Sequence, residues 1–186
     1  EWLISGDTVW QAISIKDVDG DEDLEMLITG YFYDKALHHT CATLKICTWD
    51  GLTLEWEASY QWYTYWDTYA MDIATGDLDS DGTIKILTAG YQRSGDNFYS
   101  QLRIWSWDGN LLTLKLSAEG GFIEPLTFTA GKAVAIDDVD NDGENEIVMG
   151  VDISQLTWSV PSVRIFSWNG ETLTIEDSKD WEDATN

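Results

Sequence analysis

The chain has few prolines and few cysteines among its 186 residues. Its two prolines, Pro125 and Pro161, fall outside the segments with a strand-like pattern, as expected if those segments form sheets, because proline cannot donate to a sheet ladder. Cys41 and Cys47 are six residues apart, so on one extended strand they would lie roughly 20 Å apart at about 3.3 Å per residue. That separation excludes a disulfide bond between them.

Basic residues are also scarce. Ten Lys and Arg residues stand against 34 Asp and Glu residues, which gives a net charge of −24. Such a charge argues against nucleic acids and anionic membrane surfaces as partners. The sequence has no run of about 18 apolar residues, so no membrane-spanning helix and no membrane insertion is expected.

Motifs typical of enzymes are missing as well. The sequence contains no nucleophile–base motif, no glycine-rich phosphate loop and no Cys/His spacing of a zinc site, so we expect a protein that is not an enzyme. His38 and His39 are adjacent, and neighbouring side chains of a strand point to opposite faces. One transition-metal site that uses both histidines is therefore not expected.

What the sequence does contain is an acidic stretch that occurs three times. Each copy begins with three aspartates at alternate positions, and the copies span Asp17–Glu25, Asp77–Lys85 and Asp138–Glu146. A Trp-Asx-Gly triplet follows each copy, beginning at Trp49, Trp107 and Trp168. Both landmarks recur at intervals of about 60 residues, which indicates an internal repeat. The repeats divide one segment, residues 1–186, into units at about 1–60, 61–121 and 122–180.

Each unit predicts four strands. The apolar periodicity is that of strands throughout, the acidic loop follows the first strand, and the Asx-Gly pair predicts a hairpin between the third and fourth. No segment has the pattern of an amphipathic helix. The predicted strands span Val9–Ile15, Leu24–Phe32, Thr43–Trp49, Leu52–Ala58, Tyr69–Thr75, Ile84–Gly90, Gln101–Trp107, Leu111–Leu116, Lys132–Ile136, Glu146–Val151, Ser162–Trp168 and Glu171–Ile175.

The third strand of each unit indicates the architecture. In the second unit Leu102 and Ile104 point to one face, while Trp105 and Trp107 point to the other. A four-stranded antiparallel sheet that is apolar on both faces and repeated in tandem predicts an all-β fold with three blades of a β-propeller. A two-layer sandwich is the alternative, but it does not require the repeat.

The acidic loops predict cation sites. Crowded carboxylates repel one another, and a hard cation with oxygen ligands, usually Ca²⁺, removes that cost. A helix–loop–helix calcium site needs Glu at loop position 12, where this chain has Ile28, Thr88 and Met149. We therefore predict a strand–loop–strand site, with carboxylates from positions 1, 3, 5 and 9 and a backbone carbonyl from position 7.

The candidate ligands are fourteen residues of the three loops: Asp17, Asp19, Asp21, Asp23 and Glu25; Asp77, Asp79, Asp81 and Thr83; Asp138, Asp140, Asp142, Glu144 and Glu146. The second loop has Lys85 at position 9, which removes a ligand and adds a positive charge. That loop is expected to bind calcium more weakly, or to hold the ammonium partly in place of the ion. The alternative for all three loops is an acidic turn held by its own Asx hydrogen bonds.

These loops resemble the D-x-D-x-D-G-x-x-D/E loop of FG-GAP repeats in integrin α-subunit propellers and of the related VCBS-type repeats. The third copy matches best, whereas the first has Glu22 where the family prefers Gly, and the second has Lys85. The resemblance implies calcium binding and an extracellular propeller module, secreted or at the cell surface. Its implied role is adhesion, surface assembly or binding of a protein or glycan ligand.

Propellers of this family have about six to eight blades, and three are present in this sequence. We therefore expect either a dimer that completes a six-bladed ring or a segment of a larger propeller. In both cases two open blade faces remain to be covered, which predicts self-association.

An aromatic run, Tyr60–Tyr69, suggests a second function. Aromatic rings stack on sugars, and polysaccharide-binding lectins and polysaccharide lyases with similar propellers exist. Packing of these rings between the first and second blades is the favoured interpretation, because buried aromatics dominate core energetics.

Overall fold

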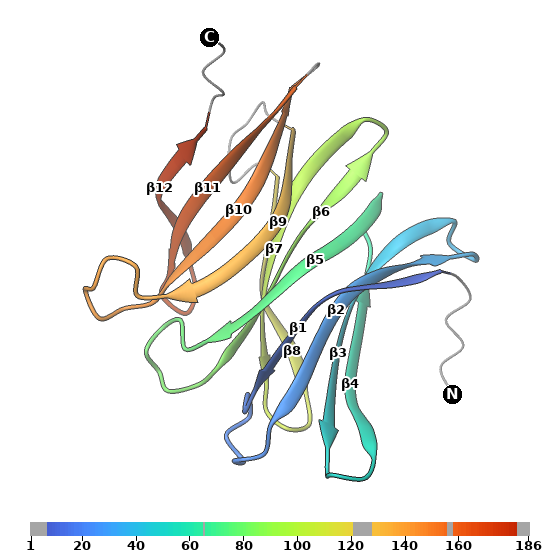
Figure 1. The fold of residues 1–186 in the computed structure, drawn as a ribbon, viewed down its shortest axis with the longest axis vertical. Helices are drawn as coiled ribbons and strands as arrows, with labels where there is room; N and C mark the ends of the chain where they lie inside the picture. Colours follow the sequence, from blue (N-terminus) through green and yellow to red (C-terminus); the bar gives the residue numbers. More distant parts are fainter. Residues whose placement is uncertain (1–6, 65, 121–127, 156–157, 182–186) are drawn as a thin grey trace.

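The computed structural model describes residues 7–64, 66–120, 128–155 and 158–181. Within these residues, twelve strands form three four-stranded antiparallel sheets, each built from four consecutive strands (Figure 1). Sheet 1 contains β1 (Thr8–Lys16), β2 (Glu25–Asp34), β3 (His39–Trp49) and β4 (Leu54–Trp62). Sheet 2 contains β5 (Asp67–Gly76), β6 (Lys85–Ser94), β7 (Asn97–Trp107) and β8 (Leu112–Glu119). Sheet 3 contains β9 (Phe128–Asp137), β10 (Glu146–Gln155), β11 (Trp158–Trp168) and β12 (Leu173–Asp180).

All twelve predicted strands are confirmed, in the predicted order and pairing, and the described residues form no helix. Within those residues there is accordingly no helix with the length and apolarity needed to cross a membrane. The predicted connectors between second and third strands are shorter than expected, because the strands extend into them. Gly95 and Asp96 alone separate β6 from β7.

The Asx-Gly turns also differ from the prediction, since each is a four-residue loop. Asp50 Oδ1 accepts hydrogen bonds from the backbone N–H groups of Leu52 and Thr53, both at 2.7 Å. The Asp50 carboxylate thus binds the backbone of the two residues where the fourth strand was predicted to begin. These residues belong to the loop, and β4 begins at Leu54 rather than Leu52.

The prediction that both prolines lie outside strands is wrong for Pro161, which lies within β11 opposite Asp152 of β10. Its carbonyl accepts a hydrogen bond from Trp181 N at 3.0 Å. Pro161 thus takes part in the sheet through its carbonyl, which does not require the backbone N–H that proline lacks. Pro125 lies outside the described residues.

The repeat extends to the irregularities of the sheets. Each sheet has a β-bulge between its first two strands, at Trp10/Ala12, Ala70/Asp72 and Gly150/Val151, and another between its last two, at Ile46/Cys47, Ile104/Trp105 and Ile165/Phe166. Bulges of this kind bend a strand and increase its twist. The three sheets are therefore copies of one twisted unit.

The sheets pack face to face, and sheet 2 lies in the middle (Figure 1). One core cluster joins Leu44 and Ile46 of sheet 1 to Ile86 and Trp105 of sheet 2. A second cluster joins the other face of sheet 2 to sheet 3. The prediction that the third strand is buried on both faces is confirmed for β7.

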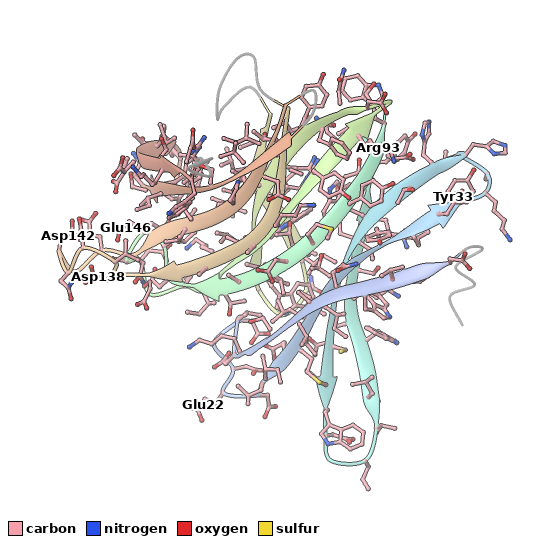
Figure 2. The ribbon with its side chains drawn as sticks, turned by 45° about the horizontal axis from the view of Figure 1, so that its top comes forward. Glu22, Tyr33, Arg93, Asp138, Asp142 and Glu146 are labelled. Carbon is pink, nitrogen blue, oxygen red and sulfur yellow. The ribbon has the colours of Figure 1, made fainter. Side chains whose placement is uncertain are left out.

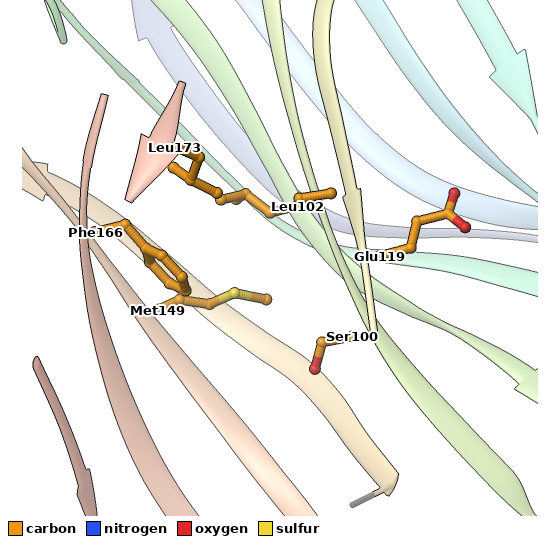
Figure 3. Close-up of a pocket in the computed structure, with 7 residues that line it drawn as sticks. Ser100, Leu102, Glu119, Met149, Phe166 and Leu173 are labelled. Atoms are coloured by element: carbon orange, nitrogen blue, oxygen red, sulfur yellow. The ribbon is translucent and has the colours of Figure 1, made fainter. Parts of the chain in front are cut away.

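A small cavity of about 10 Å³ lies in the core between sheets 2 and 3, as shown in Figure 3. Leu102, Met149 and Phe166 line it together with Ser100 and Glu119. A volume of about 10–15 Å³ holds roughly one water molecule. The cavity is therefore a packing gap rather than a ligand site.

The outer face of sheet 1, turned away from sheet 2, is largely apolar, and its apolar side chains are exposed around a buried lysine, Lys45. We define it by Trp10, Ile13, Ile15, Lys45, Trp49, Leu54 and Trp56. Ile13 is 57% exposed, whereas its equivalent Ile73 in sheet 2 is 6% exposed. Trp49 is 56% exposed, whereas Trp107 is 5% exposed. Sheets 2 and 3 thus bury the face that sheet 1 leaves open.

Candidate metal centres

The three acidic loops lie at the same end of their sheets. Figure 2 shows Glu22 and Asp138 at that end, and Tyr33 and Arg93 at the other. Three groups of carboxylates among the described residues each bring one oxygen per residue to within 4.8 Å of the others: Asp17, Asp19 and Glu25; Asp77, Asp79 and Asp81; Asp138, Asp140 and Glu146. Each group is compact enough to hold a metal ion.

Loop 1 (residues 17–24) is folded by its own first aspartate. The Asp17 carboxylate accepts hydrogen bonds from Gly20 N at 2.7 Å and from Glu22 N at 3.1 Å. Glu22 has φ +78°, where loops 2 and 3 have Gly82 and Gly143, also at positive φ. A residue with a side chain pays a conformational free energy of about 1–2 kcal/mol in that backbone region. This cost explains the preference for glycine at this position in FG-GAP and VCBS-type repeats, which the loops resemble.

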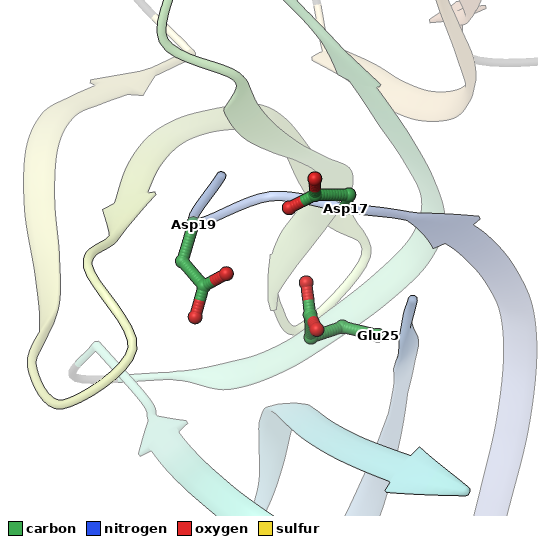
Figure 4. A group of neighbouring side chains, drawn as sticks. All are labelled: Asp17, Asp19 and Glu25. Atoms are coloured by element: carbon green, nitrogen blue, oxygen red, sulfur yellow. The ribbon is translucent and has the colours of Figure 1, made fainter. Parts of the chain in front are cut away.

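Glu25 at the start of β2 reaches back under loop 1. It is 1% exposed, and its Oε2 accepts a hydrogen bond from Val18 N at 2.9 Å. Burial raises the pKa of Glu25 to about 6, and the charge of Asp19 adds to that rise, while the Val18 hydrogen bond opposes it. Burial, followed by the charges of Asp21 and Asp17, also raises the pKa of Asp19. In Figure 4 the Asp17, Asp19 and Glu25 carboxylates point toward one another.

Loop 3 (residues 138–145) repeats this geometry. Asp138 accepts hydrogen bonds from the N–H groups of Asp142 and Gly143 at 3.1 and 3.0 Å. Glu146 is buried, and its Oε2 accepts from Val139 N at 2.9 Å. Burial raises the pKa of Glu146, and the charge of Asp140 raises it further. Both loops therefore crowd ionised carboxylates without a basic side chain paired to them among the described residues.

Loop 2 (residues 77–84) is different, because a cation already lies inside it. Lys85 Nζ is 2.8 Å from Asp79 Oδ1 and 2.9 Å from Asp81 Oδ1. Hydrogen bonds from Thr83 and Lys85 hold the pKa of Asp81 well below its ordinary value. Burial lowers the pKa of Lys85, but its hydrogen bonds to Asp79 and Asp81 outweigh burial, and the net shift is upward.

Of the fourteen predicted ligands, the structure brings nine into the three clusters. The other five are Asp21, Asp23, Thr83, Asp142 and Glu144. Asp21 and Asp142 instead cap the end of their loops, accepting hydrogen bonds from Asp23 N and Glu144 N at 2.8 Å each. The side chains of Asp23 and Glu144 are exposed, and the ligand predicted from each is its backbone carbonyl.

Sequence reasoning missed that loops 1 and 2 also approach the sheet that follows their own. A Cβ placed on Gly109, in the Asx-Gly turn of sheet 2, would lie 2.8 Å from Asp19 Oδ2. A Cβ on Gly170 of sheet 3 would lie 3.2 Å from Asp79 Oδ2. In return, Asn145 Nδ2 donates to the carbonyl of Asp77 at 2.7 Å. The constant spacing between the acidic stretches and the Trp-Asx-Gly triplets was the sequence signal from which this contact between loop and turn could have been predicted.

The histidine pair belongs to none of these clusters in the described part of the chain. His39 Nδ1 lies 3.7 Å from Asp67 Oδ1, and its ring stacks on Tyr63 with centroids 5.9 Å apart. His38 occupies the β2–β3 turn with φ +57°.

The aromatic run contains one buried and one partly exposed tryptophan. Trp62 is 7% exposed, its Nε1 donates to Gln101 Oε1 at 2.6 Å, and its ring lies 5.3 Å from that of Trp105. Packing between sheets 1 and 2 is thus confirmed for Trp62. Trp66 stacks on Tyr99 and is 39% exposed, and Tyr65 lies outside the described residues.

In comparisons with known proteins, no protein-family model and no curated protein matches this chain. The resemblance to FG-GAP and VCBS-type repeats therefore depends on the loop residues themselves.

Proposed function

We propose that this chain is a calcium-stabilised propeller module, secreted or at the cell surface, that acts in adhesion, ligand binding or surface assembly rather than catalysis. The observation that carries the proposal is the unbalanced charge of loops 1 and 3, where burial and neighbouring carboxylates raise the pKa of Glu25 and Glu146. A cation with oxygen ligands would reverse that penalty, and carboxylate and carbonyl oxygens are the ligands that Ca²⁺ takes.

The role proposed for calcium is structural. A bound ion would fix the turn between the first two strands, and loop 1 lies against the turn of the next sheet through Asp19 and Gly109. The ion would thereby stabilise both the sheet and its contact with the next one. Each site would contribute about 2.7 kcal/mol at a hundredfold excess of calcium over Kd.

The test is thermal unfolding in calcium and in chelator. We expect the melting temperature to fall on chelation, and the double variant Glu25→Gln with Glu146→Gln to lose most of that difference. Glu171→Gln, in an exposed turn, is the matched control and should respond like the parent chain. Identical melting curves in calcium and chelator would refute the structural role of calcium.

We further propose that the outer face of sheet 1 is the module's assembly surface and that sheet 3 of a second copy covers it. The equivalent face of sheet 2 is covered by sheet 1, and the equivalent face of sheet 3 is covered by sheet 2. In both cases a sheet of the same kind packs on this face. Arg103 of sheet 2, four residues before Trp107, lies 5.2 Å from the Trp62 ring of sheet 1. In sheet 1 the residue equivalent to Arg103 is Lys45, four residues before Trp49. In sheet 3 the residue equivalent to Trp62 is Trp181, so the partner's Trp181 would pack against Lys45.

One observation favours the glycan alternative. A hollow of about 90 Å³ on sheet 1 is lined by Lys45, Trp56 and Glu57 among others, and the Trp56 ring is partly exposed. Stacking on a sugar would use that ring. Binding on a glycan array that is lost in Trp56→Ala, with unchanged oligomeric state, would support this alternative.

A further inference from the structure

The ammonium of Lys85 lies inside loop 2, at the place where a metal ion would lie. Lys85 is 5% exposed. Its Nζ donates to Asp79 Oδ1 at 2.8 Å, to Asp81 Oδ1 at 2.9 Å and to the Thr83 carbonyl at 3.3 Å, and it also contacts Thr83 Oγ1. These groups belong to loop positions 3, 5 and 7, which are metal-ligand positions in the predicted site.

The equivalent residues in the other two loops are carboxylates. Glu25 and Glu146 each accept a backbone hydrogen bond from position 2 of their own loop, which a lysine cannot do. The second repeat therefore replaces an acceptor with a donor at this position. One substitution removes a negative charge and supplies a positive one.

Lys85 does not reach one buried carboxylate oxygen of loop 2. An ammonium has three hydrogens to donate, whereas calcium takes about six to eight oxygen ligands. Asp77 Oδ1 is buried and has no hydrogen-bond partner among the described residues. Loop 2 thus keeps the position-1 carboxylate of a cation site, although Lys85 uses the other ligands.

We infer that Lys85 acts as a covalently tethered cation in place of a metal ion in loop 2, so that the chain binds two divalent cations rather than three. This inference rests on the proposed function for loops 1 and 3. It also assigns loop 2 a distinct role, because sheet 2 is the central sheet and contacts both neighbours. Its loop would stay closed when calcium is removed, while loops 1 and 3 open.

The first test is a calcium titration by calorimetry. We expect the parent chain to bind two ions and Lys85→Glu, which restores the carboxylate of the other repeats, to bind three. Lys115→Glu makes the same charge change on exposed β8 and should still bind two. Three ions in the parent chain, or two in folded Lys85→Glu, would overturn the inference.

The second test uses hydrogen exchange on the parent chain and needs no variant to fold. On chelation, amides of loops 1 and 3 should exchange at least roughly tenfold faster, and those of loop 2 less than about twofold faster. Loop 2 opening as much as the other two would overturn the inference.

A chelator-only measurement separates this inference from the calcium proposal. If the chain binds no calcium, the proposed function fails, yet Lys85→Met in chelator should still speed exchange in loop 2 by about tenfold while loops 1 and 3 keep their rates. Unchanged exchange in loop 2 of that variant would contradict the tethered cation itself.

Discussion

Gly51 and Gly109 occupy the same position of equivalent turns, with φ +93° and +79°, but their surroundings differ. A Cβ on Gly51 would meet no atom within 4 Å, whereas one on Gly109 would lie 2.8 Å from Asp19 Oδ2. Alanine at either position has the same free-energy cost of positive φ, about 1–2 kcal/mol. Comparing the two alanine variants therefore separates the effect of backbone strain from the effect of contact with loop 1.

We predict that Gly109→Ala lowers both the free energy of unfolding and the calcium affinity of loop 1, because Asp19 must move. Gly51→Ala should lower the free energy of unfolding by the strain alone and leave calcium affinity unchanged. Urea unfolding and calcium titration of the two variants measure these quantities. Equal losses in both variants would show that the Asp19–Gly109 contact has no energetic consequence.

At the same scale, the sequence predicted which residues form the loops, but not which carboxylates converge into a cluster and which cap the end of the loop. Asp17 and Asp21 have the same residue type and alternate spacing, yet Asp17 joins the carboxylate cluster and Asp21 caps the end of the loop. Spacing cannot distinguish them, because the turn conformation decides which oxygens converge. The position of Lys85 inside its loop likewise depends on burial that sequence alone does not give.

At the scale of elements, the strands were predictable because each carries a strong alternating pattern between clear turn signals. The bulges were not, since one extra residue in a strand leaves the composition unchanged. The inclusion of Pro161 in β11 was also missed, because the rule against proline concerns the lost N–H, and here the carbonyl makes the contact with Trp181.

Trp62 and Trp66 lie close in sequence but differ in what they connect. Trp62, the last residue of β4, is buried against sheet 2, with Trp105 and Gln101 as neighbours. Trp66 is partly exposed beside Tyr99. We predict that Trp62→Ala lowers the free energy of unfolding by about 3–5 kcal/mol and that Trp66→Ala lowers it by much less. Chemical unfolding followed by circular dichroism tests this, and similar losses for both would contradict the difference in packing.

At the scale of the whole molecule, the repeat predicted three equivalent sheets, and the structure confirms them. The number of sheets in the assembled protein does not follow from the fold of one chain, because it depends on what covers the outer face of sheet 1. The exposed Ile13 and Trp49 there have buried equivalents in sheets 2 and 3. Leaving that apolar area in water is unfavourable, so a second copy that covered it would gain free energy.

The opposing force is charge, since each chain carries a net charge of −24. Two copies repel one another at low ionic strength, and calcium bound in loops 1 and 3 would reduce the repulsion. With two-fold symmetry, sheet 3 of each copy would meet sheet 1 of the other, so both open faces would be covered and a ring of six sheets would close.

We therefore predict a dimer, with about twice the 21.0 kDa mass of one chain, in calcium and a monomer in chelator at low salt. Light scattering after size-exclusion chromatography measures the mass. Ile13→Lys places a charge in the apolar face and should give a monomer even in calcium, whereas Leu111→Lys, on an exposed turn of sheet 2, should leave the dimer intact. A parent chain that stays monomeric in calcium at high concentration would exclude a second copy as the occupant of this face. Glycan binding there would then identify the hollow beside Trp56 as the functional feature of the face.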